Sequence, residues 1–207
     1  MANIWRMIRL SSAFIYKATK KDVNNMQTDR TSLKEKSLVF IGFMGVGKTT
    51  VAQIVAKKLY RDFIDIDYEI EKEFQMPTTE IFNLLGEEKF RKKEKDYVLH
   101  YCKQPLKVVS LGGGAFMQEA IREACLKHSI VFYLDISWDS WKERLHMLVD
   151  SRPVLQNKSI DDIEDLFHER KKTYEEHNST FITDNNDAEE VADYIIDSIK
   201  LAWELYD

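Results

Sequence analysis

The chain has 207 residues, 44% of them apolar and 31% charged, and its net charge is −5. Length and composition predict one globular domain, or one domain with an appendage. The composition excludes disordered and collagen-like proteins. A membrane-spanning helix is excluded because the longest apolar run, Leu38 to Met44, has only the length of a strand. Residues 1–36 carry eight basic and three acidic side chains, so the rest of the chain carries −10. This acidic body argues against nucleic-acid binding.

Residues 1–36 show no clean helical or strand period and end in a polar stretch. We interpret them as a flexible N-terminal extension without a core of its own. Two origins of the extension remain open. Residues 1–21 lack acidic side chains, as transit peptides do; alternatively, the true start lies downstream at Met7 or Met26. The second is favoured, because a transit peptide usually leaves a clearer amphipathic stretch.

From Ser37 onward, short apolar runs alternate with segments of helical periodicity. Strands are predicted at Ser37–Ile41, Asp62–Ile66, Leu106–Leu111, Ser129–Asp135 and Ser179–Thr183. Helical periodicity is clearest at Thr49–Tyr60, Ile160–Glu176 and Ala188–Trp203. The alternation is typical of an α/β domain, here residues 37–207, in which a parallel sheet is covered by helices on both faces.

Two segments depart from this alternation. In an insertion of about residues 68–102, the pattern predicts two helical pieces without a strand, broken at Pro77 and at Gly86. Such an insertion can build the wall of a substrate site. Residues 150–158 lie between two predicted helices, the second opened by the capping-box pattern Ser159-Ile-Asp-Asp162, and we expect a mobile lid there.

The segment Gly42-Phe-Met-Gly-Val-Gly-Lys-Thr49 fits the phosphate-loop pattern G-x-x-x-x-G-K-[ST]. It follows a predicted strand and opens a predicted helix, which is the context that the pattern requires. Its glycines let backbone N–H groups turn toward phosphate oxygens, Lys48 would reach the β- and γ-phosphates of ATP, and the Thr49 hydroxyl would ligate Mg²⁺. Taken by itself, Thr50 reads as a helix-interior residue. The predicted ATP-binding residues of this segment are Gly45, Val46, Gly47, Lys48, Thr49 and Thr50.

A phosphate-loop protein usually supplies a second Mg²⁺ partner from an aspartate at a strand end. Here the third predicted strand ends in glycines, and the nearest aspartates are Asp65 and Asp67 after the second. They are two residues apart, so both face the same crevice only if the strand has ended there. An Asp-x-Asp pair alone is usually a solvated turn, but ligands bind outside the carboxyl ends of parallel strands, which favours a functional pair.

Further motifs follow in order: Ile81-Phe82, Gly86-Glu-Glu-Lys-Phe-Arg91 with Glu94, Ser110-Leu-Gly-Gly-Gly114, Arg152-Pro153, and Arg170 with Tyr174. Together with the phosphate loop and Phe63-Ile-Asp-Ile-Asp67, this ordered set resembles the shikimate kinases from Ser37 to about Trp203. The resemblance implies a P-loop kinase three-layer sandwich, with a five-stranded parallel sheet of the nucleoside-monophosphate-kinase type. It also implies transfer of the ATP γ-phosphoryl group to the 3-hydroxyl of shikimate.

The resemblance assigns acceptor-site roles that suit a small carboxylated ring with three hydroxyls. Arg91 and Arg170 would hold the carboxylate, and Glu94, three residues after Arg91, would fix its guanidinium. Asp67 would bind two hydroxyls and orient or deprotonate the attacking one, while Asp65 would hold Mg²⁺ through water. The backbone N–H groups of Gly112, Gly113 and Gly114 would contact shikimate near the transferred phosphate.

Two more arginines complete the predicted nucleotide site. Arg152, in the predicted lid, would stabilise the charge on the transferring phosphoryl group and is counted with Lys48 and Asp67 as catalytic. Arg144 stands where the family stacks an arginine on adenine. One departure concerns Arg170: many relatives have a proline two residues later, whereas this chain has Lys172, so the helix can continue.

Other residue types are assigned no chemistry. Cys102 and Cys125 are too few, and too far apart in sequence, for a disulfide framework or a zinc site, so we expect reduced core thiols in a cytoplasmic protein. The histidines lack ligand spacing. The tryptophans at 138, 141 and 203 are interpreted as packing residues on helices.

The predicted partners are ATP and shikimate, with neither nucleic acid nor a membrane, and the default oligomeric state is a monomer. Two alternatives remain at this point. One is a related kinase acting on gluconate or a nucleoside monophosphate, because fold does not fix substrate. The other is a regulatory module that binds nucleotide without turnover. Such a module would tolerate loss of the acceptor-site residues, and none is lost.

Overall fold

The computed structural model describes residues 32–148, 155 and 158–206. Most of the predicted N-terminal extension, residues 1–36, and most of the predicted lid, residues 150–158, lie outside these ranges. Both therefore stay predictions.

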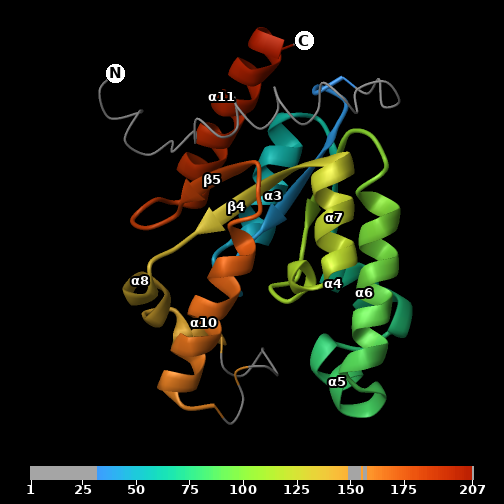
Figure 1. Cartoon of the computed structure of the whole chain (residues 1–207), viewed down its shortest axis with the longest axis vertical. Coiled ribbons are helices and arrows are strands. Elements are labelled where there is room, and N and C mark those ends of the chain that lie inside the picture. The colour runs from blue at the N-terminus through green and yellow to red at the C-terminus, as the bar shows by residue number, and fades with distance from the viewer. Residues whose placement is uncertain (1–31, 149–154, 156–157, 207) are drawn as a thin grey trace.

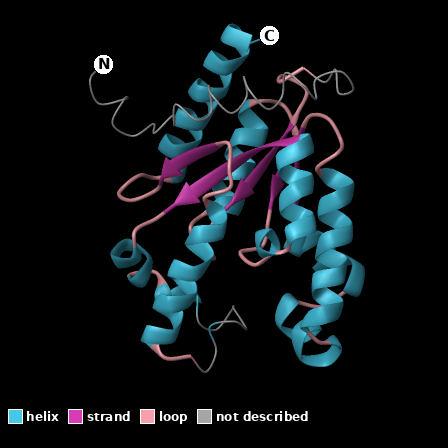
Figure 2. Ribbon diagram, in the orientation of Figure 1, coloured by secondary structure: helices cyan, strands magenta, loops and turns pink. Residues whose placement is uncertain are grey.

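Five strands form one parallel sheet in the order β2-β3-β1-β4-β5. The strands are β1 (Ser37–Ile41), β2 (Asp62–Asp65), β3 (Lys107–Ser110), β4 (Ser129–Asp135) and β5 (Ser179–Ile182). Figure 2 shows that their arrows run in the same sense. β1 is the central strand and is buried along its whole length, which explains why its sequence is an apolar run rather than an alternation. The predicted α/β class and five-stranded parallel sheet are confirmed.

Helices cover both faces of the sheet. They are α3 (Lys48–Lys58), α4 (Ile66–Phe74), α5 (Thr78–Leu85), α6 (Glu87–Tyr101), α7 (Glu119–His128), α8 (Trp138–Lys142), α9 (Leu145–Leu148), α10 (Ile160–Tyr174) and α11 (Ala188–Tyr206), with a 3₁₀ turn η1 (Ala115–Met117). α3 packs against α11 and against β2 and β3, whereas α7 packs against β4 and α6. In Figure 1, α6 and α7 lie in front of the sheet and α3 lies behind it.

The segment between β2 and β3 differs from its prediction in one respect. It holds three helices, α4, α5 and α6, where two were predicted. The extra helix arises because Asp65 ends β2 and its side chain accepts a hydrogen bond from the Tyr68 backbone N–H, which caps α4 directly after the strand. α4 ends at Phe74, ahead of the predicted breaks at Pro77 and Gly86, and its C-cap Gln75 has a left-handed φ of 54°.

α10 begins as predicted: Ser159 and Asp162 form the reciprocal bonds of a capping box. Its buried face consists of Ile163, Phe167, Arg170 and Tyr174, spaced at helical intervals. An arginine within an apolar stripe is unusual, because a buried guanidinium requires partners. The partners of Arg170 lie at the candidate site described below.

The two cysteines are free and fully buried, as predicted. They are not far apart in space, however: hydrogen bonding to the Cys125 thiol lowers the pKa of the Cys102 thiol. Their proximity follows from the packing of α6 against α7, which distance along the sequence does not reveal. Within the described residues, none of the helices combines the length and the apolar character that crossing a membrane requires.

Candidate active site

The phosphate loop connects β1 to α3, and it places the N-terminus of α3 at the carboxyl edge of the sheet. Gly45 and Gly47 have left-handed φ angles of 77° and 102°, and Gly47 is the N-cap of α3. The Lys48 ammonium donates hydrogen bonds to the carbonyls of Gly42 and Phe43, both at 2.9 Å. Lys48 therefore lies along the loop, in position to exchange these carbonyls for phosphate oxygens.

Hydroxyl and carboxylate oxygens gather beside this loop. The Thr49 hydroxyl donates to Asp65 Oδ2 at 2.7 Å, and Ser110 Oγ lies 3.4 Å from the same hydroxyl. Oxygen donors of this kind suit Mg²⁺, which keeps several waters and takes few protein ligands. Thr49 and Asp65, predicted as the metal residues, are thus brought together. Ser110 belongs to the glycine motif quoted above but was given no role at the metal site, because one serine at a strand end carries no such signal of its own.

The glycine run after β3 is the meeting point of the predicted acceptor-site residues. A Cβ atom built on Gly112 would lie 2.6 Å from Asp67 Oδ1 and 3.1 Å from Glu94 Oε1. One built on Gly114 would lie 2.6 Å from Arg91 Nη2. Side chains from α4 and α6 therefore lie directly against this backbone, and a side chain on Gly112 or Gly114 would require them to shift.

Arg91 is fixed in place by two carboxylates of α6. Its guanidinium makes ion pairs of 3.0 Å with Glu87 and 2.8 Å with Glu94, and it lies over the rings of Phe82 and Phe90. Glu94 is fully buried and also accepts a hydrogen bond from the Gln118 amide at 2.8 Å. Burial raises the pKa of Glu94 to about 7, against the opposing effect of Arg91. The predicted Arg91–Glu94 contact is confirmed, whereas Gln118 was missed.

Arg170 reaches the glycine run from α10. It is 8% exposed, and its Nη1 donates to the Gly113 carbonyl at 3.2 Å. Burial lowers the pKa of Arg170, and the positive charge of Arg91 lowers it further. Two guanidinium groups that repel each other beside one loop would be stabilised by an anion between them. α10 continues through Lys172 to Tyr174, so the missing proline does not displace Arg170 from the site.

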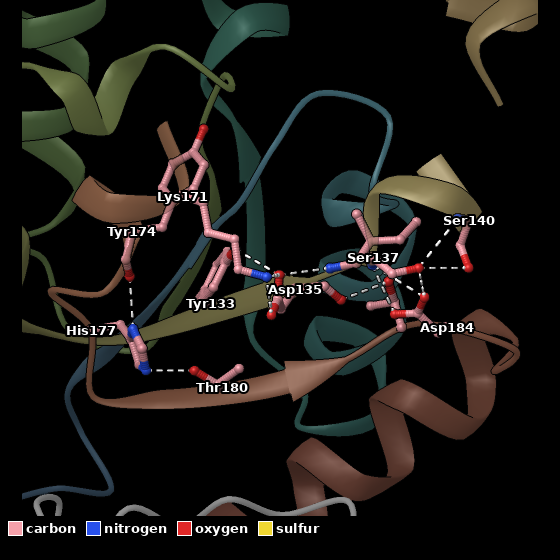
Figure 3. A network of polar contacts seen from close by, with 11 residues as sticks. Tyr133, Asp135, Ser137, Ser140, Lys171, Tyr174, His177, Thr180 and Asp184 are labelled. Carbon is pink, nitrogen blue, oxygen red and sulfur yellow. Dashed lines mark hydrogen bonds and ion pairs between the residues drawn. The ribbon is translucent and has the colours of Figure 1, made fainter. Parts of the chain in front are cut away.

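Tyr174 holds the same carbonyl from the next turn of α10. Its hydroxyl donates a short hydrogen bond to the Gly113 oxygen, and the whole side chain is buried. Figure 3 shows the polar contacts that hold the C-terminal end of α10 next to Tyr174. The His177 ring contacts the Tyr174 carbonyl and Thr180 of β5, and the Tyr174 ring stacks on Tyr133 with 5.4 Å between centroids.

A second anchor holds α10 to β4. The Lys171 ammonium donates to both Asp135 oxygens, at 2.8 and 2.9 Å, and the Tyr133 hydroxyl donates to the same carboxylate at 2.8 Å (Figure 3). The sequence resemblance included Tyr174 without a role for it, and the links through Tyr133, Asp135 and Lys171 were not predicted. A basic residue beside Arg170 and an aspartate at a strand end are too common to indicate this pairing.

The remaining predicted ATP-site residues lie at the rim or outside the described structure. Arg144 donates to the carbonyls of Gly45 and Val46 at 3.3 and 3.4 Å, so it contacts the phosphate loop, and its stacking on adenine stays a prediction. Thr50 is exposed in the first turn of α3. Arg152 lies outside the described residues.

Comparisons with known proteins identify the family of the chain. A family model described as shikimate kinase matches residues 44–200. The chain belongs to the shikimate kinase family. A curated shikimate kinase from Oceanobacillus iheyensis is 60% identical over 175 residues, which cover 84% of this chain and 96% of that protein. The predicted recognition of the family is confirmed.

Solved structures separate the shikimate kinase family from its neighbours in fold. A shikimate kinase from Acinetobacter baumannii in complex with shikimate is 30% identical with a TM-score of 0.75, covering 81% of this chain and 94% of that one. A gluconokinase from Sinorhizobium meliloti, 15% identical with a TM-score of 0.51 over 83% and 95% of the two chains, shares the fold alone. The P-loop kinase fold is therefore common to both, and the sequence identity favours the shikimate kinases over the gluconate alternative.

Proposed function

We propose that this protein transfers the γ-phosphoryl group of Mg²⁺-bound ATP to the 3-hydroxyl of shikimate. One observation carries the residue assignment: Asp67, Arg91 and Arg170, which lie far apart in sequence, all meet the glycine run beside the phosphate loop. Membership of the shikimate kinase family supports the reaction. The substrate-specific set also argues against gluconate or a nucleoside monophosphate as acceptor.

In the nucleotide half, backbone N–H groups from Gly45 to Thr50 bind the phosphates, and Lys48 moves from the loop carbonyls to phosphate oxygens. Thr49 and Asp65 hold Mg²⁺, directly or through water. When bound, the ion neutralises phosphate charge and orients the phosphates. Arg144 binds adenine, and Arg152 contacts the γ-phosphoryl group when the lid closes. The contact between Thr49 and Asp65 supports the metal assignment.

In the acceptor half, Arg91 and Arg170 hold the shikimate carboxylate between them. This role is supported by their placement beside neighbouring glycines of the run and by their mutual repulsion. Asp67 accepts hydrogen bonds from shikimate hydroxyls and orients or deprotonates the attacking one. Among the described residues, no backbone carbonyl outside the helices and strands accepts from the N–H groups of Gly112, Gly113 and Gly114, which supports a role for them as donors to substrate.

We further propose that residues 37–207 form the kinase domain, with residues 68–102 as the shikimate-binding insertion and residues 150–158 as the lid. The enzyme acts as a cytoplasmic monomer on two small molecules, without nucleic-acid or membrane partners. The two buried free thiols support a reducing compartment.

Release of ADP tests the proposal when shikimate, gluconate and nucleoside monophosphates are compared as acceptors. We expect turnover with shikimate and only background rates with the others. Preference for another acceptor would contradict the substrate assignment. Nucleotide binding in a calorimeter without turnover on any acceptor would support the regulatory alternative instead.

A further inference from the structure

The helix α8 is anchored to the loop after β5 by a compact set of hydrogen bonds. Ser137 is its N-cap and accepts from the Ser140 backbone N–H. The Asp184 carboxylate in turn accepts from the Ser137 backbone N–H at 3.1 Å and from its hydroxyl, as Figure 3 shows. α8 has only five residues, so these anchors, rather than helix length, fix its position.

Trp141 extends from this helix to the phosphate loop. Its side chain is fully buried, and its indole N–H donates to the Met44 carbonyl at 2.7 Å. The ring packs edge-on against Phe43 at 5.1 Å and stacks on Trp138 at 5.3 Å. This contact joins residues 97 positions apart in sequence, and it reaches backbone inside the phosphate-binding motif.

The hydrogen bond to Met44 has a consequence for the next residue. In a trans peptide unit, the carbonyl of one residue and the N–H of the following residue point in opposite directions. A Met44 carbonyl held against α8 therefore turns the Gly45 N–H away from α8. No group in the described residues accepts from this N–H, so it is available to a phosphate oxygen.

We propose that Trp141 is a positioning residue for the phosphate loop, fixing the Met44–Gly45 peptide so that the Gly45 N–H faces the phosphates of the nucleotide. The inference rests on the proposed nucleotide-binding role of this loop and adds a residue that makes no contact with substrate. Met44 also touches the acceptor side, since a Cβ on Gly113 would lie 3.0 Å from its backbone nitrogen.

The test compares Trp141→Phe with Trp138→Phe. Both substitutions replace an indole of the same stacked pair by the smaller phenyl ring, but only Trp141→Phe removes the hydrogen-bond donor to the Met44 carbonyl. Calorimetry would measure the Kd of MgADP and of shikimate, and initial rates would give kcat and the KM for ATP. For Trp141→Phe we expect about a 5- to 30-fold weaker MgADP affinity and a comparable rise in the KM for ATP, with the shikimate Kd within about twofold of wild type. Trp138→Phe should leave all four values near wild type.

Three outcomes are decisive. Wild-type MgADP affinity in both variants would overturn the inference. Equal weakening of MgADP binding in both variants would overturn it as well, because a packing effect would then explain both. Failure of the wild-type protein to bind MgADP would contradict the proposed function rather than the role of Trp141. If Trp141→Phe does not fold, 3-benzothienylalanine at position 141 keeps the ring shape and replaces N–H by sulfur. An unchanged MgADP Kd in that protein would overturn the inference, and a weakened one would support it.

Discussion

The two halves of the site are built in different ways. The nucleotide half is centred on one run of eight residues, Gly42–Thr49, whose backbone turns between a buried strand and a helix. The acceptor half has no such run. Its charged side chains come from α4, α6 and α10 and meet on three glycines after β3. The first half thus relies on local backbone geometry, and the second on long-range packing.

The difference also affects how substitutions propagate. In the acceptor half, Glu94 is fully buried and Arg170 nearly so, and each balances other charges nearby. Removing one member of a buried ionic group leaves its partners uncompensated, so the effects of single substitutions there are large and do not add. Substitution of Lys48 or Thr49, the polar side chains of the phosphate loop, should instead act mainly on nucleotide binding or turnover.

The largest expected effect is that of Asp67→Asn, which keeps size and removes the charge that orients or accepts the proton. We expect kcat to fall by about 10²- to 10⁴-fold with unchanged MgATP affinity, measured by initial rates at saturating substrates. Asp65→Asn is the matched comparison, because asparagine still caps α4. It should weaken binding of the Mg²⁺–nucleotide complex. If Asp67→Asn showed that signature instead, Asp67 would belong to the metal site.

Lys48→Ala tests the nucleotide half. The loss of its positive charge beside the phosphates should lower kcat by roughly 100-fold or more, while shikimate affinity and melting temperature stay near wild type. Lys57→Ala, on the exposed side of the same helix, serves as the control. Retention of more than about a tenth of the wild-type kcat by Lys48→Ala would show that the loop backbone suffices without this lysine.

What the sequence predicted follows the same division. The phosphate loop and the central strand were predicted because each is contiguous, and local pattern determines both. The resemblance added Asp67, Arg91 and Arg170, and the structure places all three against the glycine run. Burial of Trp141 was also predicted correctly.

Other contacts were not accessible to sequence reasoning. Ser110, Gln118 and Trp141 act through bonds whose partners lie in other elements, and no spacing rule relates them. The third helix of the insertion was missed because the aspartate that ends β2 also caps α4, which the strand pattern alone does not show. One signal was available: Arg170 and Tyr174 continue the apolar stripe of α10, where an arginine indicates a buried polar partner.

The buried carboxyl of Glu94 gives the acceptor half a pH dependence. Its pKa is about 7 in the folded protein, above the ordinary value of 4.5, so the folded state binds the extra proton between these values. Stability should therefore fall as pH rises from about 4.5 to 7, by on the order of 2 kcal/mol relative to Glu94→Gln, which lacks the titrating group. Denaturant unfolding of both proteins from pH 5 to 8 measures the difference. A difference that is constant with pH would contradict a raised pKa.

The smallest effect is expected from Tyr174→Phe, which tests whether the glycine run is held from α10. The substitution keeps the ring that stacks on Tyr133 and removes only the hydroxyl that donates to Gly113. Arg170 still donates to that carbonyl, so the peptide loosens without being released. We expect the KM for shikimate to rise by about 3- to 10-fold, the value of one hydrogen bond, with the KM for ATP unchanged. Tyr133→Phe is the control: it removes the hydroxyl of the other ring in the stack, which donates to Asp135, and Asp135 still accepts a hydrogen bond from Lys171. An equal rise in the KM for shikimate in both variants would show that the docking of α10 as a whole, rather than the bond to Gly113, determines shikimate binding. A rise confined to Tyr174→Phe would show that the hydrogen bond to the Gly113 carbonyl positions the glycine run.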